Sequence, residues 1–203
     1  MLINFLCRLT KSLQRKRLFS KLHSFGDKFS CDPSTKILLP RFFSAGNNVF
    51  IGEQSYISAK VDIADNVMFG PRVIILGGNH HFAVKGRFTR DLKQDPSKEV
   101  IPILIECDVW IGACSTIIGP VTIGSGSVIG ANSVVTKSIA PYTVNVGSPS
   151  SAIRLIFNDA DLFEHLCALG NDKLLAKKIV YSRNFMVGDK SLPVVNRSDD
   201  YWE

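Results

Sequence analysis

The chain has 203 residues, of which 45% are hydrophobic and 21% are charged. These values suit one globular domain with short extensions and exclude a chain that is disordered throughout. The net charge of +6 comes entirely from residues 1–26, which carry six basic residues and no acidic one. Residues 27–203 are electrically balanced, so we expect no nucleic-acid partner for the main body.

Residues 1–26 predict a basic amphipathic helix. Leu2, Leu6, Leu9 and Leu13 recur at helical spacing. A signal peptide is not supported, because the basic residues follow the short apolar stretch instead of preceding it. The apolar run is also too short to span a membrane. Two interpretations remain: a helix packed on the main body, or peripheral contact with an anionic membrane surface.

The five cysteines are odd in number and show no Cys-x-x-Cys spacing. This pattern is typical of reduced thiols in a cytoplasmic protein, and it argues against a disulfide framework or a zinc site. We therefore expect a cytoplasmic protein without a bound metal. If residues 1–26 contact lipid, the protein lies at the inner face of the membrane.

The middle of the chain repeats with a period of six. This period is neither the 3.6 of a helix nor the 2 of a long strand. It is typical of a β-helix, in which three hexapeptides form one triangular coil and the apolar residue of each points inward. The thirteen positions, which predict a little over four coils, are Leu39, Ala45, Ile51, Ile57, Ile63, Phe69, Ile75, Ile105, Ile111, Ile117, Ile123, Ile129 and Val135.

The stretch "GSGSVIG", residues 124–130, is superficially similar to a glycine-rich dinucleotide loop. A true dinucleotide motif needs glycines that follow a strand and open a helix. Here the glycines occupy turn positions of the six-residue repeat, and no helical pattern follows them. The repeat therefore argues against a Rossmann fold.

Residues 108–154, "DVWIGACSTIIGPVTIGSGSVIGANSVVTKSIAPYTVNVGSPSSAIR", resemble the signature region of the hexapeptide-repeat acyltransferases. The nearest branch comprises the galactoside, maltose, xenobiotic and polysaccharide O-acetyltransferases. With the upstream repeat, the resemblance covers about residues 39–156. It implies a left-handed parallel β-helix, acetyl-CoA as donor, and a homotrimer with active sites in the grooves between subunits.

The expected fold is all-β, a left-handed parallel β-helix with helical segments at both ends. We expect the β-helix over residues 27–156, with a loop insertion at 81–102. This insertion either shapes the acceptor pocket of a neighbouring groove or is a plain surface loop. Residues 157–203 are expected to form helices and a tail that cover the end of the β-helix, the first helix being capped by Asn158 or Asp159 and ending at Gly170.

The resemblance implies specific site residues. The family's catalytic histidine matches His80, with His81 as a bystander, and the acceptor site includes Asn79 and Trp110. The donor-binding positions that the resemblance implies are Ala113 and Ala131 for the pantetheine arm, Thr136 and Lys137 near the adenosine, and Arg154 for the phosphates. The sequence departs from the family at Ser150 and Ser151, where alanine and a basic residue are usual, so one cation for the phosphates is missing.

The chemistry implied is transfer of an acetyl group from a thioester to a sugar hydroxyl. A neutral alcohol is a poor nucleophile, and the imidazole of His80 has a suitable pKa to remove its proton near neutrality. Direct transfer needs no covalent enzyme intermediate. The acceptor is either a cell-surface polysaccharide or its precursor, or a small molecule such as an antibiotic or a free or nucleotide-linked sugar. A non-catalytic trimeric scaffold is the remaining alternative.

Overall fold

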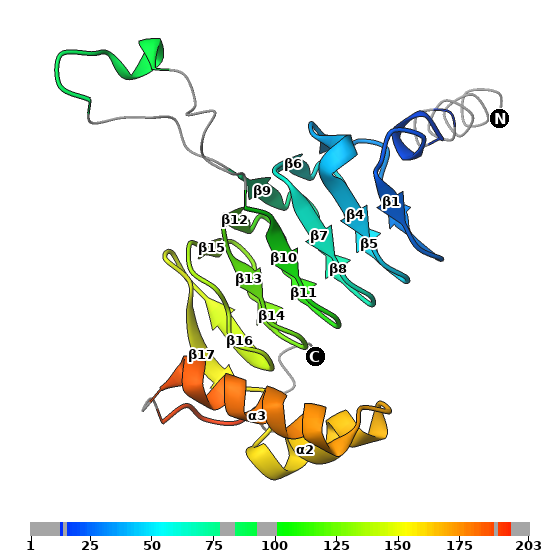
Figure 1. Ribbon diagram of the computed structural model, residues 1–203, viewed down its shortest axis with the longest axis vertical. Coiled ribbons are helices and arrows are strands. Elements are labelled where there is room, and N and C mark those ends of the chain that lie inside the picture. The colour runs from blue at the N-terminus through cyan, green and yellow to red at the C-terminus, as the bar shows by residue number, and fades with distance from the viewer. Residues whose placement is uncertain (1–12, 14–15, 78–83, 93–100, 189–190, 196–203) are drawn as a thin grey trace.

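The computed structural model describes residues 13, 16–77, 84–92, 101–188 and 191–195. Asn79, His80 and His81 lie outside the described residues. The body is a solenoid of short parallel strands, and the C-terminal helices lie at its end (Figure 1).

Three sheets form the sides of the solenoid, and all their strand pairs are parallel except β16 with β17. Sheet A contains β1 (Ser24–Phe25), β4 (Phe43–Ala45), β7 (Val61–Ile63), β10 (Ile103–Ile105) and β13 (Thr122–Ile123). Sheet B contains β2 (Ser30–Cys31), β5 (Phe50–Ile51), β8 (Met68–Phe69), β11 (Trp110–Ile111), β14 (Val128–Ile129), β16 (Thr143–Val146) and β17 (Ser151–Leu155). Sheet C contains β3 (Lys36–Ile37), β6 (Tyr56–Ser58), β9 (Ile74–Leu76), β12 (Thr116–Ile118) and β15 (Val134–Val135).

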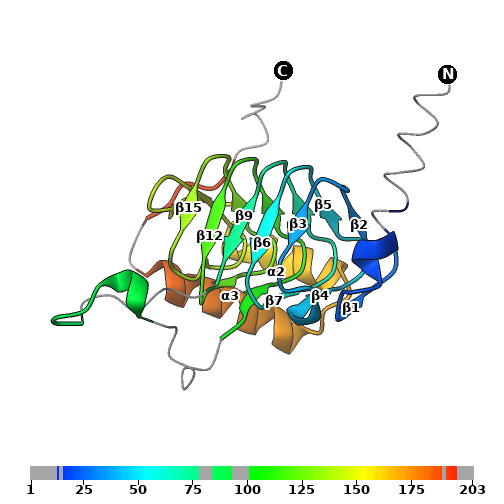
Figure 2. The same ribbon diagram turned by 90° about the horizontal axis from the view of Figure 1, so that it is seen from above.

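The chain visits sheets A, B and C in turn and winds left-handed about the long axis (Figures 1 and 2). The described strands make five complete coils and part of a sixth. The repeated apolar residues stack inside the prism, and their burial drives formation of the solenoid. Ile57, Ile75 and Ile117, for example, are aligned in successive strands and have no exposed surface. The predicted fold class is confirmed.

The six-residue register breaks near the start of the solenoid, and the sequence interpretation missed this break. A short 3-10 helix, η1 (Pro40–Phe42), makes the step from Ile37 to Ala45 eight residues long. Leu39 was expected inside the prism, but it is 40% exposed. The expectation was wrong because the inward position before this turn is Ile37, two residues earlier than Leu39. Ile37 and Cys31 belong to a first coil that the sequence did not predict.

The N-terminal end of the prism is closed by aromatic side chains. Residues 16–19 are helical, and β1 then begins at Ser24, inside the segment 1–26 for which we expected a helix. Phe19 packs against Phe25 and Phe29 with ring centroids 5.1 and 5.0 Å apart. Because the first coil has no neighbour on this side, these rings exclude water from its interior.

The C-terminal end is covered by two helices, as expected. Helix α2 (Asp159–Ala168) begins at the N-cap Asn158, whose side chain accepts a hydrogen bond from the Asp161 backbone. Helix α3 (Lys173–Val187) follows Asp172, which caps it in the same way. Both helices pack on the last coil around a small core, which contains Tyr142, Leu162, Leu166 and Ala176. No described helix is long and apolar enough to cross a membrane.

An ion pair between the buried Arg183 and the exposed Asp159 holds α3 to the start of α2. The Arg183 side chain is fully buried and donates hydrogen bonds to the Asp159 carboxylate and to the Phe157 carbonyl. Asn184 also donates to Asp159 at 2.8 Å. The position of α3 over the last coils is therefore fixed by polar contacts as well as by apolar packing.

Candidate functional site

Two turns of the solenoid carry the expected donor-binding residues. At the turn between sheets B and C, Ala113 lies directly beneath the turn that contains Ala131, and the Ala113 carbonyl accepts a hydrogen bond from Asn132 at 2.8 Å. Stacking is close: a Cβ on Gly112 would lie 2.6 Å from the Ala131 nitrogen. Glycine and alanine therefore give this edge a smooth surface on which an extended chain can lie.

The opposite edge of sheet C is the turn between sheets C and A. Thr136 and Lys137 follow β15 there and are both exposed. The strand pairing places Leu76 beside Ile118, so Gly77 occupies the corresponding turn two coils away from Lys137. The insertion that contains His80 leaves the solenoid after Gly77. Lys137 and the starting point of this insertion thus share one edge of the molecule.

Trp110 lies on a different side, in the middle of sheet B. Its side chain is 37% exposed and is aligned with Met68 on one neighbouring strand and Val128 on the other. Phe50 continues the same row and, like Met68, is about half exposed. These four residues form an outward-facing apolar row along sheet B, which we call the sheet B row.

Arg154 is half-buried on β17, the strand that pairs antiparallel with β16 at the end of sheet B. It lies opposite Val144, on sheet B, whereas Lys137 follows sheet C. Between them, residues 147–150 run along β15, with hydrogen bonds from Val134 to the Gly147 carbonyl and from Ser150 to the Val134 carbonyl. Within one chain, Arg154, Lys137 and Trp110 therefore do not lie on the same face.

The described part of the insertion extends away from the body of its own chain (Figure 1). It contains a short 3-10 helix, η2 (Thr89–Asp91), and Phe88 before it is 82% exposed. None of residues 84–92 belongs to the apolar clusters of the solenoid.

Comparison with known proteins agrees with this geometry. Residues 102–137 match the family model described as bacterial transferase hexapeptide (six repeats). A maltose O-acetyltransferase from Clostridium difficile 630 is 31% identical, with a TM-score of 0.63 over 71% of this chain and 75% of that one. The chain belongs to the hexapeptide-repeat acyltransferase family.

Two galactoside acetyltransferases give further comparisons with this hexapeptide-repeat protein. The Escherichia coli K12 galactoside O-acetyltransferase is 40% identical over 125 residues, which are 60% of this chain and 61% of that one. A galactoside acetyltransferase solved with coenzyme A is 30% identical, with a TM-score of 0.52 over 72% of this chain and 71% of that one. The chain spans about three fifths of the length of the first curated relatives that it matches.

The turn between sheets A and B holds a polar cluster that sequence reasoning missed. Tyr142 is buried there and packs edge-on against His165 of α2, with ring centroids 5.6 Å apart. Burial, aided by the negative charges of Asp108 and Cys107, raises the pKa of Tyr142 to about 12. Burial also raises the pKa of Asp108, and the nearby charge of His165 opposes that rise. The available signal was Tyr142 itself, which has a positive φ where the four preceding coils have asparagine, aspartate or glycine.

The described residues contain no group of three or more histidine, cysteine, aspartate or glutamate side chains that could hold a metal ion. The two edges of sheet C carry different kinds of side chain. The small side chains of one edge and the Lys137 cation of the other edge are compatible with a pantetheine arm and a phosphate-bearing nucleotide, respectively.

Proposed function

We propose that this protein is an acetyl-CoA-dependent O-acetyltransferase whose acceptor is a sugar of a cell-surface polysaccharide or its precursor. One observation carries the proposal: a chain of this family places the expected pantetheine positions, Ala113 and Ala131, on one edge of sheet C. Lys137 lies at the other edge of sheet C, where the insertion that contains His80 begins. The galactoside acetyltransferase solved with coenzyme A supports the choice of donor.

In the proposed reaction, the imidazole of His80 accepts the proton of the acceptor hydroxyl as that oxygen bonds to the acetyl carbonyl carbon. The carbon–sulfur bond of the thioester then breaks, and the coenzyme leaves as a thiolate. The imidazolium of His80 returns its proton to this sulfur, so the enzyme ends unchanged. A thiolate is a good leaving group because a thiol pKa is only about 8 to 9, and no covalent enzyme intermediate is needed.

The acceptor has a second candidate. Maltose and galactoside O-acetyltransferases are named for small sugars, so a free sugar is the alternative to a polysaccharide. Both alternatives share the attacking group, a sugar hydroxyl.

We further propose that the site is completed by a second copy of the chain in a homotrimer. The sheet B row (Phe50, Met68, Trp110 and Val128) is a continuous exposed apolar surface of the kind that marks a protein interface. The described insertion residues extend away from their own solenoid, which supports a contact of this insertion with a neighbouring subunit. In the trimer that we propose, Trp110 of one subunit and His80 of the next line one groove.

The function is tested by incubating the purified full-length protein with labelled acetyl-CoA and a panel of free sugars, oligosaccharides and surface glycans. We expect label to become attached to at least one sugar through an ester, which mild base removes. Transfer to amines only, or no transfer to any sugar, contradicts the proposal. The matched protein with His80→Ala serves as the control for non-enzymatic acetylation.

A further inference from the structure

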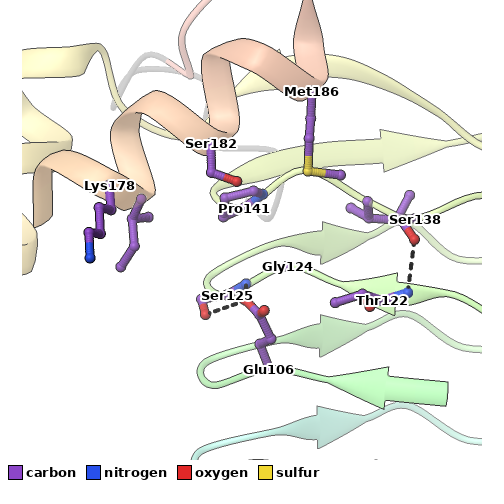
Figure 3. Close-up of a pocket in the computed structure, with 11 residues that line it drawn as sticks. Glu106, Thr122, Gly124, Ser125, Ser138, Pro141, Lys178, Ser182 and Met186 are labelled. Atoms are coloured by element: carbon purple, nitrogen blue, oxygen red, sulfur yellow. Dashed lines mark hydrogen bonds between the residues drawn. The ribbon is translucent and has the colours of Figure 1, made fainter. Parts of the chain in front are cut away.

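A cleft lies between α3 and the last coils (Figure 3). Its volume is about 460 Å³. The floor is formed by Ile139 and Pro141 of the last coil, and Met186 of α3 projects toward it from above. None of the site residues that the family resemblance implies lines this cleft.

Polar groups line the sides of the cleft. Glu106 accepts hydrogen bonds from the backbone and the hydroxyl of Ser125, both at 2.8 Å and both to one carboxylate oxygen. Its second oxygen has no hydrogen-bond partner among the described residues. Lys178 of α3 also lines the cleft, and within the described residues it has no ion-pair partner. Ser138 and Ser182 add hydroxyl groups.

This combination of groups suits a carbohydrate. One carboxylate and one ammonium group leave the cleft without net charge, which disfavours a phosphate or another strongly anionic ligand beside Glu106. A sugar ring presents apolar C–H faces and a rim of hydroxyls, which match the floor of Ile139 and Pro141 and the polar sides. Ligand sites commonly combine an apolar lining with a few placed polar groups in this way.

The cleft is also close to the edge from which the insertion with His80 departs. Ser138 follows Lys137 in the turn between sheets C and A, and the pairing of β9, β12 and β15 places this turn two coils beyond Gly77. Neighbouring strands are about 4.8 Å apart, so two coils correspond to roughly 10 Å along the axis. A chain of several sugars can span the distance from the cleft to the start of the insertion at Gly77, whereas a single sugar cannot.

We propose that the cleft beneath α3 is a subsite for a carbohydrate chain, which holds sugars beyond the one that is acetylated. The inference rests on the proposed function and deepens it, because a remote sugar subsite favours an oligosaccharide or polysaccharide acceptor over a free sugar. Lys178 and Ser182 bind the chain, while the reacting hydroxyl lies at the groove with His80. Binding of the remote sugars lowers the Michaelis constant of long acceptors.

The test uses the full-length protein saturated with coenzyme A and two pairs of probes: glucose with maltotetraose, and galactose with its β-1,4-linked tetrasaccharide. Ser182 is exposed on α3 and its side chain points toward Pro141 (Figure 3), so Ser182→Phe fills the cleft without disturbing a buried contact. Lys177→Phe is the matched control, since Lys177 is exposed on the same helix and does not line the cleft. Melting temperatures establish that both variants fold.

Calorimetric titration of the unmodified protein is expected to show about tenfold tighter binding of at least one tetrasaccharide than of its monosaccharide. Ser182→Phe should remove this difference and Lys177→Phe should keep it. Equal affinity for short and long probes, or an unchanged preference in Ser182→Phe, overturns the proposal. A Ser182→Phe variant that loses affinity for acetyl-CoA also overturns it, because the cleft then belongs to the donor site. If no sugar is acetylated, the proposed function fails separately, and the binding data still decide whether the cleft holds carbohydrate.

Discussion

At the scale of single residues, the serines of the solenoid turns show how this fold tolerates buried hydroxyls. Ser127 donates to the Gly124 carbonyl and Ser133 donates to the Gly130 carbonyl, both at 2.7 Å. Each hydroxyl thereby satisfies a carbonyl three residues earlier. Ser150 differs, because its buried hydroxyl oxygen has no partner among the described residues.

Ser150→Ala is therefore expected to stabilise the protein by about 1 kcal/mol, since an unpaired buried polar group costs roughly 1–3 kcal/mol. Urea denaturation of the two proteins measures the difference. Ser133→Ala is the control, and we expect it to destabilise, because Ser133 also accepts a hydrogen bond from Gly147 at 3.2 Å. A Ser150→Ala variant less stable than the parent would show that the hydroxyl has a partner.

If His80 is the general base, His80→Ala should reduce turnover by roughly 10²- to 10⁴-fold, the usual cost of losing acid–base catalysis. His81→Ala should change turnover only a few-fold, and binding of acetyl-CoA should survive in both. The two variants are assayed together at saturating acetyl-CoA. The opposite result, an inactive His81→Ala with a nearly normal His80→Ala, means that the base is one residue later than proposed.

Lys137→Ala should raise the Michaelis constant for acetyl-CoA more than it lowers turnover, because the ammonium group acts on phosphates remote from the reacting carbonyl. The effect should shrink as salt rises, since exposed charges are screened. Initial rates at several salt concentrations test both points. Lys60→Ala is a useful control: Lys60 lies at the same edge, at the turn after β6. Unchanged donor affinity in Lys137→Ala places the phosphates elsewhere.

At the scale of the secondary-structure elements, the turns are as specific as the strands. Gly126, at the turn between sheets A and B, has a φ of +65°, and a Cβ there would collide with the ring of Tyr142. Gly170, after α2, has a φ of +88° and open space around it. An alanine at either position would be strained, because the backbone is in the left-handed region. Only at position 126 would its Cβ also clash with a neighbouring side chain.

Gly126→Ala should therefore destabilise by about 2–4 kcal/mol, the sum of backbone strain and overpacking. Gly170→Ala should cost only about 1 kcal/mol, because strain acts there alone. Thermal and urea denaturation of both variants provide the measurement. Equal losses would mean that Tyr142 moves aside without cost and that the close packing at this turn is not rigid.

The strands and turns also show why most coils of the solenoid could be predicted from the sequence, whereas the first coil could not. Each apolar residue in the six-residue register excludes water from the prism, so the period directly reports which side chains point inward. The step from Ile37 to Ala45 breaks that period, because η1 adds two residues outside the prism. Local periodicity carries no signal across such an addition, so the register was continued to Leu39 and the first coil was missed.

At the scale of the whole molecule, the site is harder to predict than the fold. Motif matching assigned Trp110, Lys137 and Arg154 to one reaction, yet Trp110 and Arg154 lie on sheet B while Lys137 follows sheet C. Sequence positions do not reveal which faces of a prism meet a second prism. The cleft beneath α3 could not be predicted either, because Lys178 and Glu106 lie far apart along the chain. They line one cleft only because α3 packs on the last coils.

The spread of these residues over different faces has a consequence for assembly. The proposed homotrimer should have about three times the chain mass of 22.4 kDa in light scattering. If its groove combines His80 of one subunit with Trp110 of the next, then His80→Ala and Trp110→Ala chains should each form trimers with little activity.

Co-expression of the two variant chains should then restore activity, because a mixed trimer contains grooves in which an intact His80 faces an intact Trp110. With random mixing in equal amounts, about a quarter of the grooves regain both residues in a cyclic trimer. Activity of the mixture is compared with that of the separately purified variants combined after assembly, where subunits have not exchanged. A monomer that still acetylates sugars, or a co-expressed mixture no more active than its components, shows instead that each chain supplies both residues to its own site.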